Sequence, residues 1–519
     1  MSAILAATGS FEVPTIEYAA LAPILMVLGG AVVSVLLEAF LPQRLRRPVQ
    51  LTLTFATLVA AFVFVVLARG TRAIVAEGSV AVDGPTLFMQ GSILVLAFIA
   101  ALVMAERQVD PAGDAFAPRA SALPGSEEEQ EFTRLGWFQT EVWPLFLFSV
   151  GGMLLFPAST DLLTMFVALE VLSLPLYVLA GLARRRRLLS QEASLKYFVL
   201  GAFSSAFFLY GTALLYGFAG TVELRGIANA LTASAGQSGL VIAGTALLMV
   251  GLLFKIGAAP FHQWTPDVYQ GSPTSITGFM AACTKVAAFG ALLRVMYVAL
   301  GGIRWDWRPV MYVIAALTMI VGTIFALTQT DIKRMLAYSS VAQAGFMLVG
   351  VLATSAAGLA GTMVYLLAYG VATVGAFAII TLVRDATGEA THLSSWAGLG
   401  KKSPLVASAF ALFLLAFAGI PLTSGFTGKF AVFTAGIAGG ATPVVIVGVV
   451  ASAVAAFFYI RVIVLMFFNE PPADGGASVV IPSSFTTFAI TITVAITLVI
   501  GVLPQIVLQL VDQAGVFVR

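Results

Sequence analysis

The chain reads Phe254-Lys255-Ile256-Gly257-Ala258-Ala259-Pro260 inside a run of residues, 239–262, that is otherwise almost entirely apolar. Proline lacks a backbone donor and clashes with the preceding helical turn, so a helix at this place is either kinked or broken. A second apolar run contains Ala416-Phe417-Ala418-Gly419-Ile420-Pro421, again with glycine shortly before proline, although the spacing differs by one residue. The two runs are five predicted helices apart and would have opposite directions, which is typical of an inverted repeat with one broken helix in each half. A simple proline kink in each helix explains the pattern equally well.

The composition indicates a protein that lies in a membrane. Of the 519 residues, 60% are hydrophobic and only 10% are charged, which is far outside the range of water-soluble domains. The first apolar run, residues 18–40, is long enough to span a bilayer and is expected to be a retained helix rather than a cleaved signal peptide. The net charge is only +2 and the arginines cluster at the ends of apolar runs, so no nucleic-acid partner is expected.

The residue types that hold metals and redox groups are almost missing. Cys283 is the only cysteine, which excludes an intrachain disulfide and a cysteine-ligated zinc or iron–sulfur site. His262 and His392 are the only histidines, and their positions at a helix end and in a loop argue against a bis-histidine haem or a zinc triad. No phosphate-binding loop is evident. We therefore expect no cofactor in this chain and any redox chemistry in partner chains.

At about 20 apolar residues per crossing, the sequence predicts an all-α polytopic membrane protein with about fourteen transmembrane helices. The predicted segments are 18–40, 50–68, 86–105, 141–157, 161–182, 192–217, 239–262, 273–300, 309–328, 334–353, 357–383, 405–438, 442–468 and 484–509. The longest polar insertion, about residues 106–136, is interpreted as a solvated, partly disordered segment, with a docking loop as the alternative.

Lysines and arginines are distributed unevenly between alternate loops. One set of loops contains Arg44, Arg46, Arg47, Arg107, Arg119, Arg134, the run Arg184 to Arg187, Lys333, Arg334, Arg384, Lys401 and Lys402. The opposite set contains only Arg69, Arg72, Arg225, Arg304 and Arg308. Because cytoplasmic loops carry the excess of basic residues, the first set is predicted to be cytoplasmic and both termini to lie outside.

Glu170 and Lys255 lie deep in predicted helices, where a charged side chain costs on the order of 2.5 to 3.5 kcal/mol. A lone buried carboxyl group is expected to take up a proton unless a cation is close by, and a nearby carboxylate favours the charged form of a lysine. Moving or protonating Glu170 could therefore switch Lys255 between its charged and neutral forms, which is the physical basis of a proton gate. The alternatives are a purely structural buried pair and, for Lys255, a side chain that snorkels to the surface.

Two further lysines lie inside predicted helices. Lys285 is close to the middle of its helix, and the small residues around it, among them Gly278 and Ala288, allow neighbouring helices to approach closely. This favours an interior position with a functional role. Lys429 follows Pro421 by eight residues and is interpreted either as the last protonatable group before the outside or as a snorkelling side chain.

Lys196 and Tyr338 are accessory candidates. Lys196 is one turn from Glu192 at the start of a predicted helix, which favours an ion pair at the helix end. Tyr338 begins a polar line that could admit water toward the central lysines, with ordinary hydrogen bonding between helices as the alternative; the line continues with Ser339, Ser340 and Gln343. Arg294 and Arg461 are interpreted as snorkelling anchors or packing partners near an interface.

A longer motif adds a family resemblance. Residues 261–274 read Phe261-His262-Gln263-Trp264-Thr265-Pro266-Asp267-Val268-Tyr269-Gln270-Gly271-Ser272-Pro273-Thr274. This stretch resembles the signature of the antiporter-like membrane subunits of respiratory complex I, and its Val268-Tyr269-Gln270-Gly271 core is similar to one branch of that family rather than to the sister subunits. Further matches are Phe166-Val167-Ala168-Leu169-Glu170 with Ser173-Leu174-Pro175-Leu176-Tyr177, Glu192-Ala193-Ser194-Leu195-Lys196-Tyr197-Phe198, Lys333-Arg334-Met335-Leu336-Ala337-Tyr338-Ser339-Ser340 and Gly425-Phe426-Thr427-Gly428-Lys429-Phe430. The resemblance covers nearly the whole chain.

The resemblance implies one transmembrane domain over residues 1–519. Its parts are N-terminal helices and a polar loop in 1–136, a first five-helix repeat in 137–300, an inverted second repeat in 301–468 and a last helix in 469–519. It further implies that helices seven and twelve are discontinuous.

The same resemblance implies one proton-translocation unit. Glu170 and Lys255 would form its central pair, Lys285 would be the connecting lysine and Lys429 the outer one. Relatives often have a histidine where this chain has Gln343. Because glutamine cannot titrate, a relay that needs protonation at this position is in doubt, whereas a water-mediated path is not.

The expected function is that of a proton-translocating membrane subunit of NADH:quinone oxidoreductase in a bacterial plasma membrane. Its partners would be the other membrane and peripheral subunits, which would hold the FMN, the iron–sulfur clusters and the quinone. Two alternatives stay open, a subunit of an Mrp-type cation/proton antiporter and a structural spacer. Sodium as the transported ion also stays open.

Overall fold

The computed structural model describes residues 16–109, 113–117, 126–135, 140–234, 239–385, 388–472 and 476–518. Regular structure in these ranges is overwhelmingly helical, which confirms the all-α prediction. Twelve helices of the described chain are long and apolar enough to span a membrane. Two shorter apolar helices, Val142–Ala158 and Pro404–Ala418, fall in the predicted fourth and twelfth segments. The protein is therefore a polytopic membrane protein, and the count of fourteen crossings stays a prediction.

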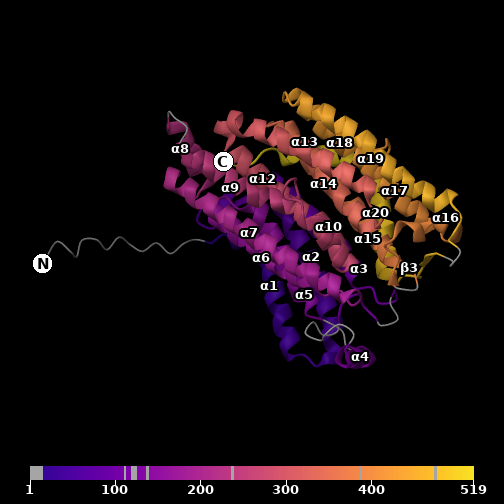
Figure 1. The fold of residues 1–519 in the computed structure, drawn as a ribbon. Helices are drawn as coiled ribbons and strands as arrows, with labels where there is room; N and C mark the ends of the chain where they lie inside the picture. Colours follow the sequence, from indigo (N-terminus) through magenta and orange to yellow (C-terminus); the bar gives the residue numbers. More distant parts are fainter. Residues whose placement is uncertain are drawn as a thin grey trace.

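Figure 1 shows the helices as a bundle whose N-terminal, central and C-terminal parts lie beside one another. The first part contains α1 (Tyr18–Phe40), α2 (Gln43–Leu67), β1 (Ala73–Val75), β2 (Val80–Val82), α3 (Gly84–Met104), α4 (Glu127–Arg134), α5 (Val142–Leu155), the turn η1 (Phe156–Ala158), α6 (Leu162–Ala180), α7 (Arg187–Ala219), α8 (Leu224–Ala233) and α9 (Gly239–Ile256). The central part contains α10 (Trp264–Gly271), α11 (Thr274–Phe279), η2 (Met280–Thr284), α12 (Lys285–Arg294), η3 (Val295–Ala299), η4 (Gly301–Ile303), α13 (Arg304–Thr328), α14 (Ile332–Leu352) and α15 (Ala356–Leu382). The last part contains β3 (Val383–Asp385), β4 (Gly388–Glu389), η5 (Leu393–Trp396), α16 (Leu399–Lys402), α17 (Pro404–Ala418), α18 (Ser424–Ala438), α19 (Thr442–Phe468), β5 (Ser478–Val479), α20 (Ser484–Val502) and α21 (Gln505–Ala514).

The short strands belong to connections between helices. β1 and β2 form an antiparallel hairpin between α2 and α3. β3 pairs antiparallel with both β4 and β5, so this small sheet joins the connection after α15 to the connection before α20.

Several element ends differ from the sequence-based prediction. α2 begins at Gln43 rather than near residue 50, so the arginines after the first helix lie in its first turns rather than in a loop. The predicted last segment, 484–509, is two helices, because α20 ends at Val502 and Pro504 starts a new turn into α21. The described part of the polar insertion contains the helix α4 and a buried Asp114. The remainder of its predicted disorder lies outside the described residues.

Two helices are interrupted where glycine precedes proline. α9 ends before Gly257, whose φ is +78°, and the next helix α10 starts at Trp264. α17 ends before Gly419, whose φ is +80°, and α18 starts at Ser424. A positive φ is favourable for glycine and closes a helix with a final backbone hydrogen bond. Gly257 N donates to Leu253 O and Gly419 N to Leu415 O, each at 3.0 Å. The chain thus has breaks at these places and not proline kinks.

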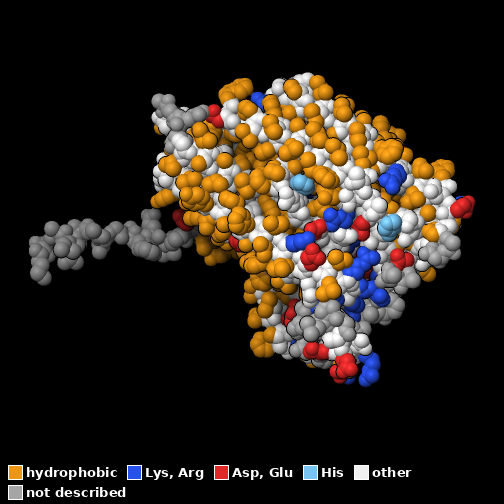
Figure 2. Space-filling model, in the orientation of Figure 1, with side chains coloured by type: hydrophobic (Ala, Val, Ile, Leu, Met, Phe, Trp, Pro, Cys, Tyr) orange, Lys and Arg blue, Asp and Glu red, His pale blue; other side chains and the backbone are white. Residues whose placement is uncertain are grey.

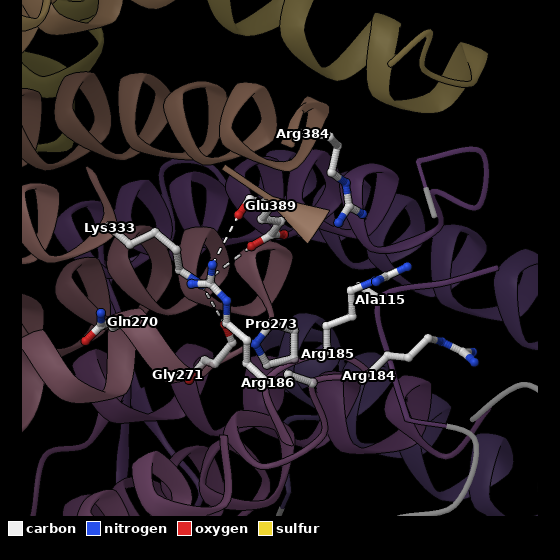
Figure 3. Close-up of a pocket in the computed structure, with 12 residues that line it drawn as sticks. Ala115, Arg184, Arg185, Arg186, Gln270, Gly271, Pro273, Lys333, Arg384 and Glu389 are labelled. Carbon is white, nitrogen blue, oxygen red and sulfur yellow. Dashed lines mark hydrogen bonds and ion pairs between the residues drawn. The ribbon is translucent and has the colours of Figure 1, made fainter. Parts of the chain in front are cut away.

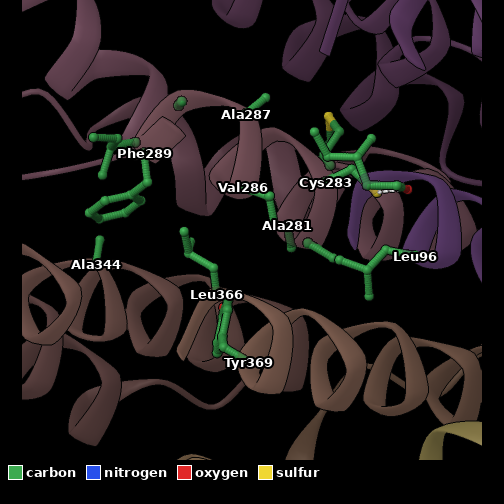
Figure 4. Close-up of a cluster of buried hydrophobic side chains, with 14 of the residues drawn as sticks. Leu96, Ala281, Cys283, Val286, Ala287, Phe289, Ala344, Leu366 and Tyr369 are labelled. Carbon is green, nitrogen blue, oxygen red and sulfur yellow. Dashed lines mark hydrogen bonds between the residues drawn. The ribbon is translucent and has the colours of Figure 1, made fainter. Parts of the chain in front are cut away.

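The most deeply buried helices are α12, α14 and α15. Figure 4 shows apolar side chains of η2 and α12, such as Val286 and Phe289, facing Leu366 and Tyr369 of α15. Every residue from 274 to 296 is buried, and α14 and α15 are buried almost as completely. Lys285, the first residue of α12, is therefore held in the core rather than on the lipid-facing surface.

Candidate functional site

Lys255 lies in the last turn of α9, inside the molecule. Its side chain is 3% exposed, and Nζ is 3.3 Å from the hydroxyl oxygen of Tyr197 on α7. The ammonium group also lies over two aromatic rings, 5.5 Å from the centre of Tyr177 and 5.1 Å from the centre of Tyr197. Such contacts between a cation and an aromatic face stabilise the charged form without a counter-ion. The snorkelling alternative for Lys255 is wrong.

Glu170 lies on α6, two turns before Tyr177, and its Oε1 atom is buried without a hydrogen-bond partner in the described chain. Glu170 is the carboxylate that interacts electrostatically with Lys255. No ion pair within 4.0 Å joins the two among the described residues, and aromatic rings take up the contact positions around the Lys255 ammonium. The interaction between the two groups is thus electrostatic and not a direct ion pair.

Lys285 is 2% exposed, and its ammonium reaches across to the break in the neighbouring helix. Nζ donates to the carbonyl oxygen of Ile256, the last residue of α9, at 2.8 Å. The last carbonyls of a helix lack intrahelical partners and carry partial negative charge, so a cation is stabilised there. Since Ile256 directly follows Lys255, the break brings the Lys285 ammonium next to the backbone of the first lysine.

Lys429 makes the equivalent contact at the second break. It is 5% exposed, and Nζ donates to the carbonyl oxygens of Phe417 and Ala418 at 2.9 Å each and to Ser452 Oγ at 2.8 Å. The ammonium also lies 4.7 Å from the ring centre of Phe346. Lys429 therefore points inward at the end of α17, and the snorkelling alternative is wrong for this lysine too.

A hydrogen-bonded network leads from α14 to Lys429. Gln343 Nε2 donates to Phe417 O at 2.9 Å, the same oxygen that Lys429 binds, and to the Tyr459 hydroxyl at 3.3 Å. Ser339 Oγ bonds the same Tyr459 hydroxyl. Tyr365 donates to the amide oxygen of Gln343. Gln343 thus fills a position where it orients a network without changing its own charge.

A cavity opens at the first break. Its volume is about 480 Å³, and its lining includes Pro260, His262, Asp267, Arg334 and Tyr338. The Tyr338 ring stacks on Phe325, with ring centres 5.4 Å apart. The predicted polar line on α14 therefore starts at a partly open cavity, lined by both polar and apolar side chains, beside the break that follows Lys255.

Lys196 belongs to the surface of this region. Nζ lies 2.7 Å from Glu192 and 2.7 Å from Asp267, and Asp267 also binds Arg334 at 2.6 Å. The predicted ion pair with Glu192 is observed, but α7 begins at Arg187, so the pair lies inside the helix rather than at its end. The Lys196 side chain is 42% exposed. Lys196 is not part of the buried set.

Figure 3 shows a second, basic cavity of about 50 Å³ with guanidinium groups from the run 184–186 and from Arg384 around it. Lys333 lies at its inner edge and is buried, with Nζ 2.8 Å from Ser272 O and 3.9 Å from Glu389. Figure 2 shows charged side chains of both signs in a band below an apolar surface. Five basic residues predicted to share one side of the membrane line this cavity: Arg184, Arg185, Arg186, Lys333 and Arg384. Arg119, predicted on the same side, falls outside the described residues.

A buried ion pair lies at another place in the fold. Arg294 Nη2 is 3.0 Å from Asp83 Oδ2, and the two side chains are 1% and 0% exposed. Burial alone would raise the pKa of Asp83, but Arg294 and hydrogen bonds from Thr86 and the backbone of Val518 outweigh it, so the pKa is lowered. Of the two interpretations of Arg294, the snorkelling anchor is wrong because the residue is buried, whereas the packing partner is confirmed by its contact with Asp83.

Several residues of the site were not found from the sequence. Tyr197, Tyr459 and Ser452 each supply a hydroxyl group to a buried lysine or to its network, yet their positions in apolar helices are typical of packing. The predicted helix begins at residue 334 and leaves Lys333 in a loop, whereas α14 begins at Ile332 and the Lys333 side chain is buried.

The fold and the sequence both have relatives. A family model described as the transmembrane part of NADH:quinone oxidoreductase and Mrp antiporters matches residues 159–455. NADH-quinone oxidoreductase subunit N of Rhodococcus opacus is 63% identical over 99% of this chain and 99% of its own length. A chain of respiratory complex I from Thermus thermophilus superposes with a TM-score of 0.76 at 33% identity, covering 95% of this chain and 100% of that one.

A chain of the Mrp complex from a Dietzia species also has a TM-score of 0.76, but its identity is 23%, over 96% of this chain and 97% of that one, so the likeness concerns the fold. The branch favoured by the Val268–Gly271 core is subunit N, the counterpart of mitochondrial NADH dehydrogenase subunit 2, and the curated relatives confirm that resemblance. From the residues matched and the identity over nearly the full length, the chain belongs to the subunit N family of NADH-quinone oxidoreductase, a group of antiporter-like membrane proteins.

Proposed function

We propose that this chain conducts protons across the membrane along Glu170, Lys255, Lys285 and Lys429, as part of an NADH:quinone oxidoreductase. The observation that carries the proposal is the state of the three lysines. Each is buried, each ammonium is held by neutral oxygens or aromatic rings, and none has a carboxylate within 4.0 Å in the described chain. Groups of this kind are close to the balance between charged and neutral forms, because desolvation opposes the charge and no counter-ion fixes it.

The proposed sequence of events starts at Glu170. Quinone reduction in partner subunits changes the electrostatic environment of Glu170, and the coupling of Glu170 to Lys255 then changes. The proton of Lys255 passes to Lys285, whose ammonium lies at the same helix break. It continues through water and the network around Gln343 to Lys429 and leaves on the outer side. The cavity beside Tyr338 supplies the replacing proton from the cytoplasm.

The broken helices support this route. Each break exposes carbonyl oxygens that hold an ammonium group without a full negative charge. A carboxylate in the same place would bind the proton carrier as a permanent ion pair, and the lysine would then stay charged. Helix ends therefore provide moderate stabilisation, which is what a group that must both take up and release a proton needs.

The proposal also covers the setting of the chain. The chain would lie in a bacterial plasma membrane with both termini outside, assembled with the other membrane and peripheral subunits that hold the cofactors. It would consist of two inverted five-helix repeats in 137–300 and 301–468. The two helix breaks in α9–α10 and α17–α18 support the repeats, and the single face that collects the basic residues supports the orientation.

The experiment uses the assembled complex in sealed vesicles and measures proton uptake beside NADH oxidation. Lys255→Met and Glu170→Gln remove the titratable groups at nearly constant volume, and Lys401→Met at an exposed ion pair is the control. We expect a lower proton yield per NADH in both variants and an unchanged yield in the control. An unchanged yield in Lys255→Met would contradict the assigned role.

The same preparations distinguish proton conduction from the three alternatives. A structural spacer predicts that Lys255→Met lowers the amount of assembled complex while the surviving complex keeps its full proton yield. A free Mrp-type antiporter predicts that the chain purifies without redox subunits. Sodium as the transported ion predicts that NADH-driven uptake follows sodium and is lost in sodium-free buffer.

A further inference from the structure

A groove on the surface of the molecule lies away from the residues of the proposed proton route. Its volume is about 440 Å³, which falls in the range of about 300–1,000 Å³ for ligand pockets. The walls are apolar and come from α2, α3, α15, α20 and α21; among them are Phe62, Val66, Leu87, Val95 and Leu510. One end is different, because Arg69 and Arg72 line the groove there.

The depth of the groove matches one leaflet of a bilayer. On α3 the lining runs from Gly84, at the arginine end, to Val95. These positions are eleven residues apart, so the groove extends about 16 Å along the helix. The hydrocarbon core of a bilayer is about 30 Å thick, and half of that is about 15 Å. The arginines therefore lie at the level of the phosphate groups when the apolar part lies in the hydrocarbon.

Both arginines are available to an anion. Each is exposed, and in the described part of the chain neither lies within 4.0 Å of a carboxylate oxygen. Arg69 binds the side-chain oxygen of Gln513 instead, and Arg72 packs against the backbone of Gly515. The C-terminal helix α21 thus positions two guanidinium groups at the mouth without neutralising them.

We propose that this groove binds a phospholipid, with one acyl chain between α2, α3 and α21 and the phosphate held by Arg69 and Arg72. Guanidinium groups suit a phosphate because their planar donors pair with its oxygens. An anionic headgroup such as phosphatidylglycerol is preferred over a zwitterionic one, because no ammonium in the headgroup opposes the two arginines. The lipid would seal the seam between the N-terminal helices and α21.

The test uses the purified complex in nanodiscs of phosphatidylcholine that contain a small fraction of phosphatidylglycerol with a photoreactive acyl chain. We expect crosslinks in residues 84–95 of α3 that saturate with the probe. Replacing both arginines, Arg69→Gln with Arg72→Gln, removes about 1 kcal/mol each and lowers the apparent affinity about 30-fold. Arg225→Gln, an arginine elsewhere in the same predicted set of loops, is the control and leaves the crosslinking unchanged.

A second variant tests the apolar part alone. A Cβ atom on Gly91 would meet Val65 at 3.6 Å and Phe62 at 3.8 Å, which are ordinary contacts, so Gly91→Leu places its side chain in the groove without moving the backbone. We expect Gly91→Leu to abolish crosslinks to α3. Equal crosslinking of all variants would overturn the proposal. A lack of crosslinks to α3 in the wild-type complex would also overturn it, because a neighbouring subunit would then fill the groove. Displacement of the probe by glycerol 1-phosphate would show a site for free phosphate and would also overturn it.

Discussion

Replacing Arg294 by methionine should destabilise this chain far more than any surface substitution. Arg294→Met leaves the carboxylate of Asp83, which is 0% exposed, without its cation. It also removes the hydrogen bond to Pro157 O at 2.7 Å and the contact of the guanidinium group with the Phe517 ring, which is centred 4.4 Å away. Breaking a buried ion pair by removing one partner costs about 3–5 kcal/mol, which raises the population of opened molecules about 150- to 4,000-fold.

Cys283 provides an assay that reports on this chain alone. It is the only cysteine, it is fully buried, and it lies on the same helical segment as Arg294. A maleimide–polyethylene glycol reagent can attach to it only when the segment opens, and the labelled chain is then separated by its size. When opening is fast relative to labelling, the labelling rate of the detergent-solubilised complex follows the open population.

The control is Lys401→Met, which breaks an exposed ion pair with Glu470. Such pairs contribute about 0–1 kcal/mol, so labelling should rise no more than about fivefold. The double variant with Asp83→Asn should regain part of the loss, because no uncompensated charge is left buried. Labelling of Arg294→Met within fivefold of the wild type would refute the reasoning.

Three other substitutions have different expected outcomes. Gln343→Leu removes the hydrogen bonds to Phe417 O and to two tyrosines, so it should lower the proton yield per NADH. Gln343→His should keep most of that yield. Equal proton yields in the two variants would contradict a role of the network. The pKa of Glu106, just beyond the end of α3, is lowered because hydrogen bonds from Thr486, Gln108 and Ser483 outweigh the effect of burial. The ionised carboxylate therefore stabilises the folded chain at pH values above its ordinary pKa, and this stabilisation is lost as the pH falls through the lowered pKa. Glu106→Gln should therefore weaken the increase of Cys283 labelling at acid pH. Lys196→Met should leave the proton yield unchanged, since its side chain is 42% exposed and its ion pairs lie at the surface; a reduced yield would place Lys196 on the route.

The sequence predicts which charges are interior better than it predicts their partners. Lys255, Lys285 and Lys429 stand out because each interrupts an apolar run, and the transfer free energy of an ammonium group does not depend on the details of the fold. Their acceptors are backbone carbonyls of residues such as Ile256 and Phe417. Every residue has a carbonyl, so no residue type in the sequence marks these contacts.

The ion pair between Asp83 and Arg294 is not predicted from the sequence, because residue types alone do not show which partners the fold brings together. Asp83 and Arg294 are 211 residues apart in the chain and each lies near a helix end, where a charge is ordinarily solvated. Only the packing of α3 against α12 and the return of the C-terminal segment bury them together. The positions of the two helix breaks, in contrast, can be predicted from the sequence, because glycine tolerates the positive φ found at Gly257 and Gly419 and a proline follows each of them. The sequence leaves open whether each site is a kink or a break, and the structure shows a break at both.

The central claim is that the buried lysines share one hydrated path. The most direct measurement is a structure of the assembled complex at a resolution that places water molecules. The account predicts ordered water from the Lys255 ammonium to Lys285 and onward to the network of Gln343 and Lys429. Closely packed apolar side chains without water between Lys285 and Gln343 would contradict it.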